Sequence, residues 1–144
     1  MLFRSFLILF LCLPATNAKV SFNEDIRPLL SNRCYRCHGP DEGDRQAKLR
    51  LDTREGALRE NKGFAAIVPG KLEDSELIYR IVTDDEDEMM PPPEKGERFT
   101  KEQIDLFKQW VEEGAKYEVH WSYTKPVRAE VPEVADQTWK ARSP

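Results

Sequence analysis

Two cysteines and a histidine within five residues are the part of this sequence best suited to chemistry. Cys34, Cys37 and His38 form the pattern Cys-x-x-Cys-His. Closely spaced cysteines occur in disulfides, zinc sites, thiol redox sites and haem attachment sites. A disulfide between residues three apart would close a very short loop and stabilise little. A structural zinc ion needs four ligands, and the rest of the chain supplies only Cys12 and His120.

The remaining two interpretations differ in the fold that they need. A thiol redox site normally lies in a βαβ unit, and no parallel-sheet pattern is present, whereas Cys-x-x-Cys-His is the signature of c-type haem attachment. Two cysteines one helical turn apart share a face and can each add to one vinyl group of the porphyrin. The adjoining imidazole can then bind the iron. We therefore predict one covalent haem c, with thioether bonds from Cys34 and Cys37 and with His38 as the proximal iron ligand.

A second iron ligand is predicted beside a run of three prolines. Met89 and Met90 lie between the acidic residues 84–88 and the prolines 91–93. Prolines donate no backbone hydrogen bond and restrict the residue before them to extended geometry. Such a stiff segment can hold a thioether over the haem, so we favour Met90 as the distal ligand, with Met89 as the alternative. His120 and lysine side chains are further candidates, although His120 falls in an apparent linker.

The ligand pair decides what the iron can do. A His/Met pair raises the reduction potential relative to two histidines. Because both axial positions are then occupied, we predict an electron carrier without catalytic residues. Arg50 and Lys71 are candidates to meet the haem propionates, although a solvated surface position is preferred for both. Six aromatic residues are candidates for the apolar shell around the haem, although for each one alone ordinary core packing is the preferred description: Phe22, Tyr35, Phe64, Phe99, Phe107 and Trp110.

The first eighteen residues have the composition of a secretory signal peptide. Arg4 is their only charge, residues 6–13 are continuously apolar, and small residues precede a cleavage site after Ala18. The apolar run is far shorter than the ~20 residues that span a membrane. We therefore predict an exported protein, periplasmic or at the cell surface, whose mature form has no membrane span. The net charge of -4 gives no reason to expect binding to nucleic acid.

Helical patterns surround the Cys-x-x-Cys-His segment. Ser21 and Glu24 fit a capping box at the start of a helix that runs into this segment. Pro28 should kink or restart that helix because it removes a backbone donor. Residues 39–50 are rich in glycine, proline and charge, which predicts a loop.

Three further helices are predicted downstream. Asp52 or Thr53 can cap a short helix that ends near Arg59, and residues 77–82 carry an apolar stripe at helical spacing. The clearest helix begins at a capping box formed by residues 100–103 and ends at Gly114. We predict one folded domain over residues 19–118. We predict that residues 119–144 form a Pro-rich linker towards a downstream domain that the sequence given does not include.

Several segments resemble the planctomycete-type cytochrome c domain. They are FNEDIRPLLSNRCYRCHGPD, LRLDTREGAL, AIVPGKLEDSELIYRI, MMPPPEKGERFTKEQIDLFKQWVEEGA and HWSYTKPVRAEVP. The resemblance implies a small all-α fold, similar to class I cytochromes c, around one covalent haem. It also implies His38 as proximal ligand and a distal methionine, and the Met-Pro-Pro of the family falls on residues 90–92. The doubled methionine departs from that pattern.

The resemblance implies electron transfer with a redox partner protein or with a fused downstream domain. Two alternatives stay open at this stage. The haem could be the structural core of a surface module for binding or assembly, because a small domain gains stability from a large apolar cofactor. Otherwise the iron could have an open site, as in a haem enzyme or ligand sensor.

Overall fold

The computed structural model describes residues 18–61 and 63–128. The predicted signal peptide lies outside this range except for Ala18, and so does most of the predicted linker. The proposed domain boundaries therefore stay predictions. Within the described ranges, no helix combines the length and the apolar character needed to cross a membrane.

The N-terminal helix begins with a π-helical turn, η1 (Phe22–Ile26), and continues as α1 (Arg27–Arg33). The Ser21 hydroxyl accepts a hydrogen bond from the Glu24 amide, as predicted. The reciprocal bond differs, because the Ser21 amide donates to Asp25 Oδ2 at 2.8 Å instead of to Glu24. Because the π-helical turn is wider than an α-helical turn, Asp25, four residues after Ser21, lies within reach of the Ser21 amide.

The geometry of this helix changes next to Pro28, as the sequence predicts. The π-helical turn ends at Ile26, and Pro28 lies in the first turn of α1. A proline is well tolerated there because the first amides of a helix have no partner within the helix. The chain then passes through Cys34 into the short helix α2 (Tyr35–His38).

The middle of the chain contains one helix that the sequence predicts and one hairpin that it does not. Helix α3 (Arg54–Leu58) is capped by the Thr53 hydroxyl, which accepts from the Gly56 amide. Strands β1 (Glu60–Asn61) and β2 (Phe64–Ala65) follow as a two-stranded antiparallel hairpin. This hairpin is a small departure from the predicted all-α fold, and the described chain is otherwise mostly helical.

Two helices complete the domain. Helix α4 (Glu76–Val82) presents three buried aliphatic side chains, and α5 (Lys101–Glu112) is the longest helix described. The predicted capping box is present at α5, with Thr100 and Gln103 each accepting from the backbone of the other. Gly114 follows with φ of 98°, a left-handed conformation that glycine adopts without strain. A 3-10 turn, η2 (Trp121–Tyr123), lies beyond the domain.

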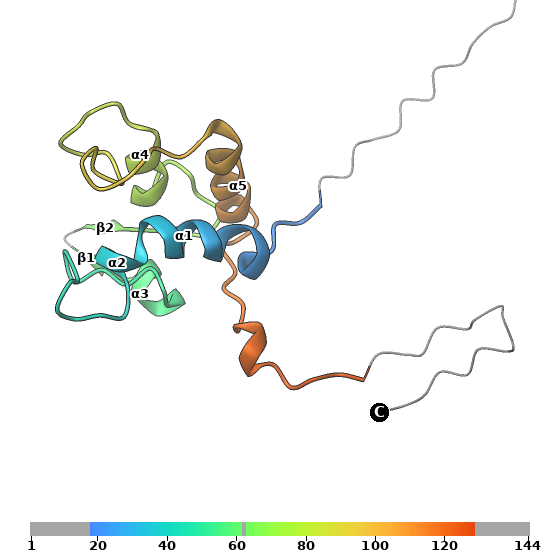
Figure 1. Cartoon of the computed structure of the whole chain (residues 1–144). Helices are drawn as coiled ribbons and strands as arrows, with labels where there is room; N and C mark the ends of the chain where they lie inside the picture. The colour runs from blue at the N-terminus through green and yellow to red at the C-terminus, as the bar shows by residue number, and fades with distance from the viewer. Residues whose placement is uncertain (1–17, 62, 129–144) are drawn as a thin grey trace, which may run out of the picture.

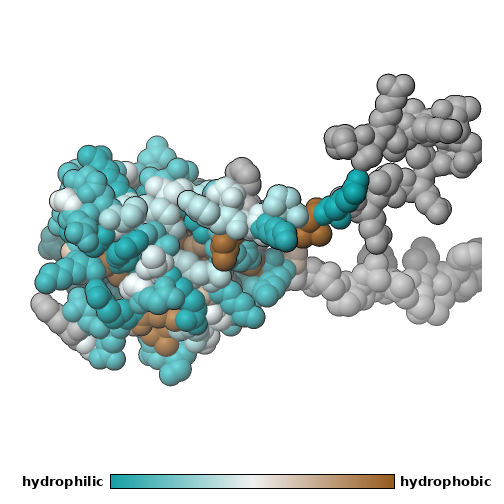
Figure 2. Space-filling view, turned by 90° about the horizontal axis from the view of Figure 1, so that it is seen from below, coloured by the Kyte–Doolittle hydropathy of each residue, from teal (hydrophilic) through white to brown (hydrophobic). Residues whose placement is uncertain are grey.

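Helix α5 contacts both η1 and α4, so the first and the last helix of the domain pack together (Figure 1). The N-terminal and C-terminal segments leave the domain on the same side. Asn23 Nδ2 donates to the Val119 carbonyl at 2.9 Å, which joins the two segments directly. The face shown in Figure 2 is mostly hydrophilic, and apolar side chains appear on it in small separate areas.

The aromatic core lies beneath α5. Its members, which we call the aromatic core from here on, are Phe22, Phe99, Phe107, Trp110 and Tyr117. Phe22 stacks on Trp110 with ring centroids 5.6 Å apart, and Phe99 meets Phe107 edge-on at 5.2 Å. These contacts show that ordinary core packing accounts for four of the residues predicted to surround a haem. Phe64 is 65% exposed in the hairpin, so its predicted place in an apolar shell is wrong.

Candidate haem site

The Cys-x-x-Cys-His segment forms a single helical turn. The Cys34 carbonyl accepts from the amides of Cys37 at 3.1 Å and His38 at 2.7 Å. The Cys34 amide itself donates to Leu30 at 2.8 Å, so this turn continues α1. Both cysteines are half-buried and their thiols are free. The sequence spacing therefore produces the expected result, in which two thiols and an imidazole come from one turn.

The loop after this turn is tied back to it. The amide of Gln46 donates to the Cys37 carbonyl at 2.7 Å, and the Leu51 amide donates to the His38 carbonyl at 2.8 Å. Gly39 makes the turn possible, because a Cβ atom there would lie 2.1 Å from the Tyr35 carbonyl oxygen. These contacts hold the loop against the turn that carries His38.

Two cavities lie beside this turn. The first, of about 310 Å³, is lined by Cys34, His38 and Met90. The second, of about 530 Å³, is lined by Cys37 and again by His38 and Met90. Cys34, Cys37, His38 and Met90, the four residues predicted from the sequence, thus share two neighbouring cavities, which we call the paired cavities. The first has mainly aliphatic walls, including Leu49, Leu51, Leu77 and Ile81.

Met90 reaches these cavities from the segment of residues 84–93, which we call the strap. The Met90 amide donates to the Arg80 carbonyl at 2.8 Å, which ties the strap to α4. The Met89 side chain is buried, with 8% of its surface exposed. It is not among the described residues that line the paired cavities. The Met90–Pro91 peptide bond is cis, a feature that the sequence did not predict. Of the two methionines, Met90 is therefore the one that faces the same space as His38.

The chemistry of His38 fits that of an iron ligand. Burial lowers the pKa of its imidazole; the nearby backbone of Gln46 opposes this, and the charge of Arg80 adds to it. A lowered pKa favours the neutral ring, which is the form that binds metals. Its Nδ1 atom is buried and, among the described residues, has no hydrogen-bond partner even though Gln46 lies near. A neutral imidazole with an unpaired ring nitrogen, facing a thioether across a cavity, is a suitable donor set for haem iron.

The thiol of Cys34 is protonated at neutral pH. Burial raises its pKa to about 12, and the positive charge of Arg33 only partly opposes this. A protonated, buried thiol is a poor nucleophile for disulfide exchange, because the thiolate is the reactive form. The environment of Cys34 therefore does not favour a thiol redox site.

The two basic candidates for the haem propionates do not line the paired cavities. Arg50 pairs with Asp52, and Lys71 pairs with Asp74 on the surface, the kind of position that the sequence analysis preferred. The first cavity instead contains Arg80 and Glu76 of helix α4, joined by an ion pair of 2.8 Å. Sequence reasoning missed this pair. Its only signal is a Glu and an Arg four residues apart in the predicted helix, a spacing typical of solvent-exposed pairs.

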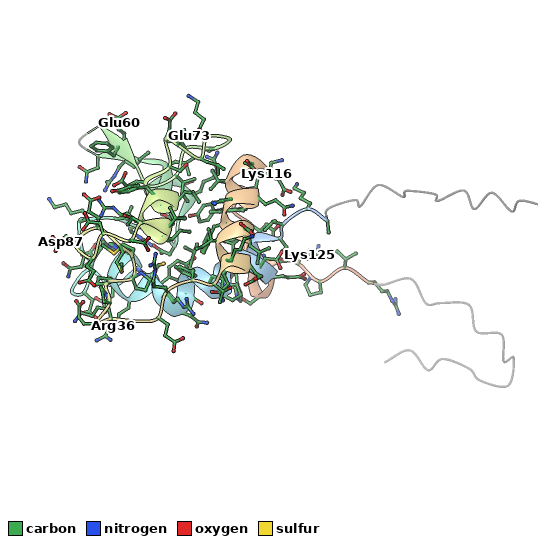
Figure 3. The ribbon with its side chains drawn as sticks, turned by 90° about the horizontal axis from the view of Figure 1, so that it is seen from above. Arg36, Glu60, Glu73, Asp87, Lys116 and Lys125 are labelled. Carbon is green, nitrogen blue, oxygen red and sulfur yellow. The ribbon has the colours of Figure 1, made fainter. Side chains whose placement is uncertain are left out.

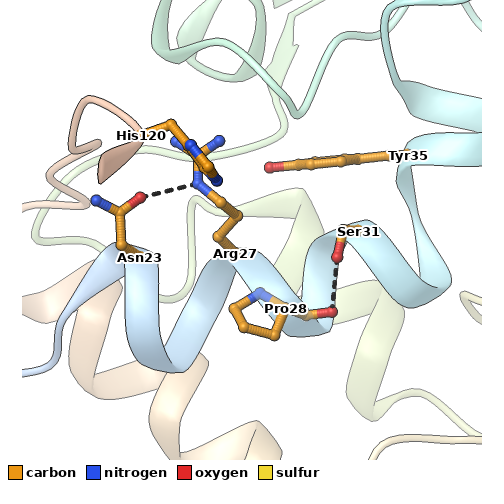
Figure 4. A pocket seen from close by; sticks show the side chains of 6 residues that line it. All are labelled: Asn23, Arg27, Pro28, Ser31, Tyr35 and His120. Carbon is orange, nitrogen blue, oxygen red and sulfur yellow. Dashed lines mark hydrogen bonds between the residues drawn. The ribbon is translucent and has the colours of Figure 1, made fainter. Parts of the chain in front are cut away.

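A third cavity, of about 400 Å³, lies beside the N-terminal helix, and its described lining includes neither His38 nor Met90 (Figure 4). It is lined by His120, Tyr35 and a face of the N-terminal helix on which Arg27 Nε donates to Asn23 Oδ1 at 2.9 Å. The Tyr35 hydroxyl is buried, and burial raises its pKa to about 12. His120 and His38 thus line different cavities, which is consistent with the preference for Met90 over His120 as the distal ligand.

Comparison with known proteins agrees with the site. Residues 34–94 match the family described as Planctomycete cytochrome C. The matched range begins at Cys34 and ends just beyond the three prolines, so it contains both cysteines, His38 and Met90. Neither a curated protein nor a solved structure with significant similarity to the chain was found.

Proposed function

Because this chain contains a planctomycete-type cytochrome c domain, we propose that it carries one covalently attached haem c and transfers single electrons. One observation supports this most directly. Two thiols, an imidazole and a thioether line the paired cavities, and they come from the turn of residues 34–38 and from the strap, which are far apart in the sequence. A haem bound there supplies an iron that alternates between Fe(II) and Fe(III).

Each residue has a separate task in this proposal. Cys34 and Cys37 would form the thioether bonds, and His38 and Met90 would bind the iron. A thioether ligand favours the reduced iron and raises the reduction potential. With two protein ligands, a bound haem iron would have no position left for a substrate. The chain is therefore proposed to be an electron carrier and not an enzyme.

The aliphatic walls of the first cavity exclude water. Leu49, Leu51 and Ile81 replace the aromatic shell predicted from the sequence. An apolar surrounding limits solvent access and dielectric, and both influence the potential of an enclosed iron. These side chains are thus proposed to tune the site without touching the electron partner.

We also propose that the protein is exported, to the periplasm or the cell surface, and exchanges electrons with a redox protein or a fused downstream domain. Figure 3 supports a free approach to the site. Arg36 of α2 and Asp87 of the strap lie at one end of the domain, whereas Lys125 lies at the end where the chain leaves. A partner could therefore reach the haem end without displacing the connecting segments.

Expression with and without a c-type maturation system tests the haem itself. We expect a mass increase of one haem, a haemochrome spectrum typical of thioether-linked haem, and a reversible one-electron titration. A colourless protein with the mass of the polypeptide alone would refute the proposal. A haem protein without a reversible potential would instead favour the structural role, which the enclosed cavities also suit.

Substituting the two methionines singly tests the distal ligand. Met90→Ala is expected to abolish the near-infrared absorption band of methionine-bound ferric haem and to let CO bind the ferrous iron rapidly. Met89→Ala is the matched control and should leave both properties unchanged. If the parent protein already lacks the band and binds CO at once, the iron has an open site, and the enzyme or sensor alternative holds.

A further inference from the structure

Arg80 makes contacts on both sides of the predicted distal methionine. Its Nη1 donates to the Glu88 carbonyl at 3.0 Å, two residues before Met90. Its own carbonyl accepts from the Met90 amide at 2.8 Å. One residue of α4 thus holds the strap through its side chain and through its backbone.

The guanidinium is itself held in position. Its second terminal nitrogen, Nη2, lies 2.8 Å from Glu76 Oε1, one helical turn earlier, and both side chains are about one-third exposed. Because partly buried charges are screened less than exposed ones, this pair should be firmer than an ordinary surface ion pair. Glu76 therefore fixes the direction from which Arg80 reaches the strap.

The same side chain borders the first of the paired cavities. His38 and Met90 line this cavity as well. Arg80 therefore borders the same cavity as the predicted proximal ligand, and it holds the strap that carries the predicted distal ligand.

We propose that Arg80 is a positioning residue that holds Met90 at the iron by clamping the strap to α4. This inference rests on the proposed function, because it takes Met90 as the distal ligand. Arginine suits the task because its planar fork can donate to two acceptors in different directions at once, here Glu76 and the Glu88 carbonyl. A lysine ammonium keeps the charge but lacks that fixed geometry.

A second contact holds the strap from outside. The Tyr79 hydroxyl bonds to the Glu88 carboxylate, and Tyr79 is 46% exposed. Contacts between exposed groups contribute little, so this bond cannot replace the clamp. We therefore expect that removing the Arg80 side chain weakens the attachment of the strap but leaves the bond between Tyr79 and Glu88 in place.

The experiment uses the full chain with haem attached and compares Arg80→Met, Arg80→Lys and Lys101→Met. Arg80→Met keeps the length of the side chain without its donors. It should lose much of the near-infrared methionine band, speed CO binding to the ferrous iron by about tenfold or more, and lower the potential. Arg80→Lys should fall between Arg80→Met and the parent. Lys101→Met removes an ion pair of the same spacing, between Lys101 and Asp105 on α5. It should change neither the methionine band, nor the rate of CO binding, nor the potential.

Two results would overturn the inference. One is a parent-like band and CO rate in Arg80→Met. The other is a changed potential with an intact band, which would mean that Arg80 acts only through its charge. If Arg80→Met does not fold, the Arg80→Lys protein decides the matter, because a parent-like CO rate there contradicts a clamp that needs the fork. Met90→Ala, measured alongside, separates the two proposals: if it leaves the band unchanged, the ligand assignment fails and not only the clamp.

A readout that does not depend on the haem spectrum is hydrogen exchange at the strap. The Met90 amide donates to the main-chain carbonyl of Arg80, which Arg80→Met retains. Faster exchange of the peptide that contains Met90 is therefore expected only because the strap loosens when the side-chain bond to the Glu88 carbonyl is lost. Peptides from α5 should exchange as in the parent. Equal acceleration in both would show general destabilisation and would contradict a local clamp.

Discussion

The two ends of this small domain are built in opposite ways. Beneath α5, the aromatic core fills the interior with its own side chains, and Trp110 is 1% exposed. Between α2, α4 and the strap lie the paired cavities, the first of which has mainly aliphatic walls. The aromatic end is thus packed by its own side chains, whereas the other end, which we call the haem end because it holds the proposed haem site, is built around two cavities.

This difference separates stability from function within one fold. Close-packed side chains stabilise a domain, while an apolar cavity forfeits contacts on its inner surface. Helix α4 belongs to both ends, because it contacts α5 on one side and borders the first cavity on the other. The haem end should therefore depend on its cofactor far more than the aromatic end does.

The largest expected effect comes from preventing haem attachment. In the double variant Cys34→Ala/Cys37→Ala, we expect the loop of residues 40–51 and the strap to lose most of their hydrogen-exchange protection. Helix α5 should retain protection, because its aromatic contacts do not involve the cavities. Exchange measured by mass spectrometry, peptide by peptide, checks this. Equal loss in α5 and the strap would mean that the two ends unfold as one unit and would end the comparison.

The converse test breaks the aromatic end. Trp110→Ala should cost about 3–5 kcal/mol of unfolding free energy, since it removes a fully buried ring and leaves a cavity. It also removes the hydrogen bond from the indole nitrogen to the Lys116 carbonyl at 3.1 Å. Urea unfolding of the haem-loaded protein measures the loss.

Phe64→Ala is the matched control for that variant. Phe64 is also aromatic, but it is 65% exposed in the hairpin. Its replacement should change the unfolding free energy by no more than about 0.5 kcal/mol. A similar cost for both substitutions would show that burial in the aromatic core is not what stabilises this end.

The same contrast explains what the sequence could predict. The cap at Thr100 and the glycine at Gly114 depend on neighbours within four residues, and both were predicted correctly. The Cys-x-x-Cys-His turn is local in the same sense. Phe64 was misplaced because the sequence pattern does not show that its hairpin projects from the core.

The strap shows where local reasoning ends. The prolines predicted a stiff segment around Met90, but its attachment to Arg80 crosses from one element to another. No spacing rule pairs an arginine of α4 with a carbonyl eight residues later in a loop. Arg50 and Lys71 were named as candidates for the haem propionates from their charge alone. Each of them forms an ion pair with a carboxylate two or three residues later in the chain.

A smaller loss of stability is expected from a substitution at Gly39, directly after His38. Gly39→Ala would place a methyl group 2.1 Å from the Tyr35 carbonyl oxygen, so the backbone after His38 must shift. We expect a cost of about 1–3 kcal/mol, with a partial loss of the methionine band if the imidazole moves. Gly43→Ala is the control, since its nearest neighbour is the movable Asp41 side chain at 3.3 Å. Equal thermal stability of the two variants would contradict the close approach at Gly39.

The smallest effect concerns pH and lies at the start of α3. The hydrogen bonds from Arg50 to Asp52 hold the pKa of that carboxyl below its usual value of 3.8. A depressed pKa in the folded protein means that the pair stabilises the fold fully above pH 3.8, and that this contribution is lost as the pH falls through the lower folded value. Asp52→Asn should therefore be less stable than the parent near neutral pH, and the difference should shrink below pH 3.8. Urea unfolding from pH 7 to pH 3 measures this difference in stability.

Because the ion pair between Arg50 and Asp52 is partly exposed, the effect is expected to be modest and to weaken with salt. A difference that grew on acidification would have the wrong sign for a depressed pKa and would contradict a stabilising pair between Arg50 and Asp52.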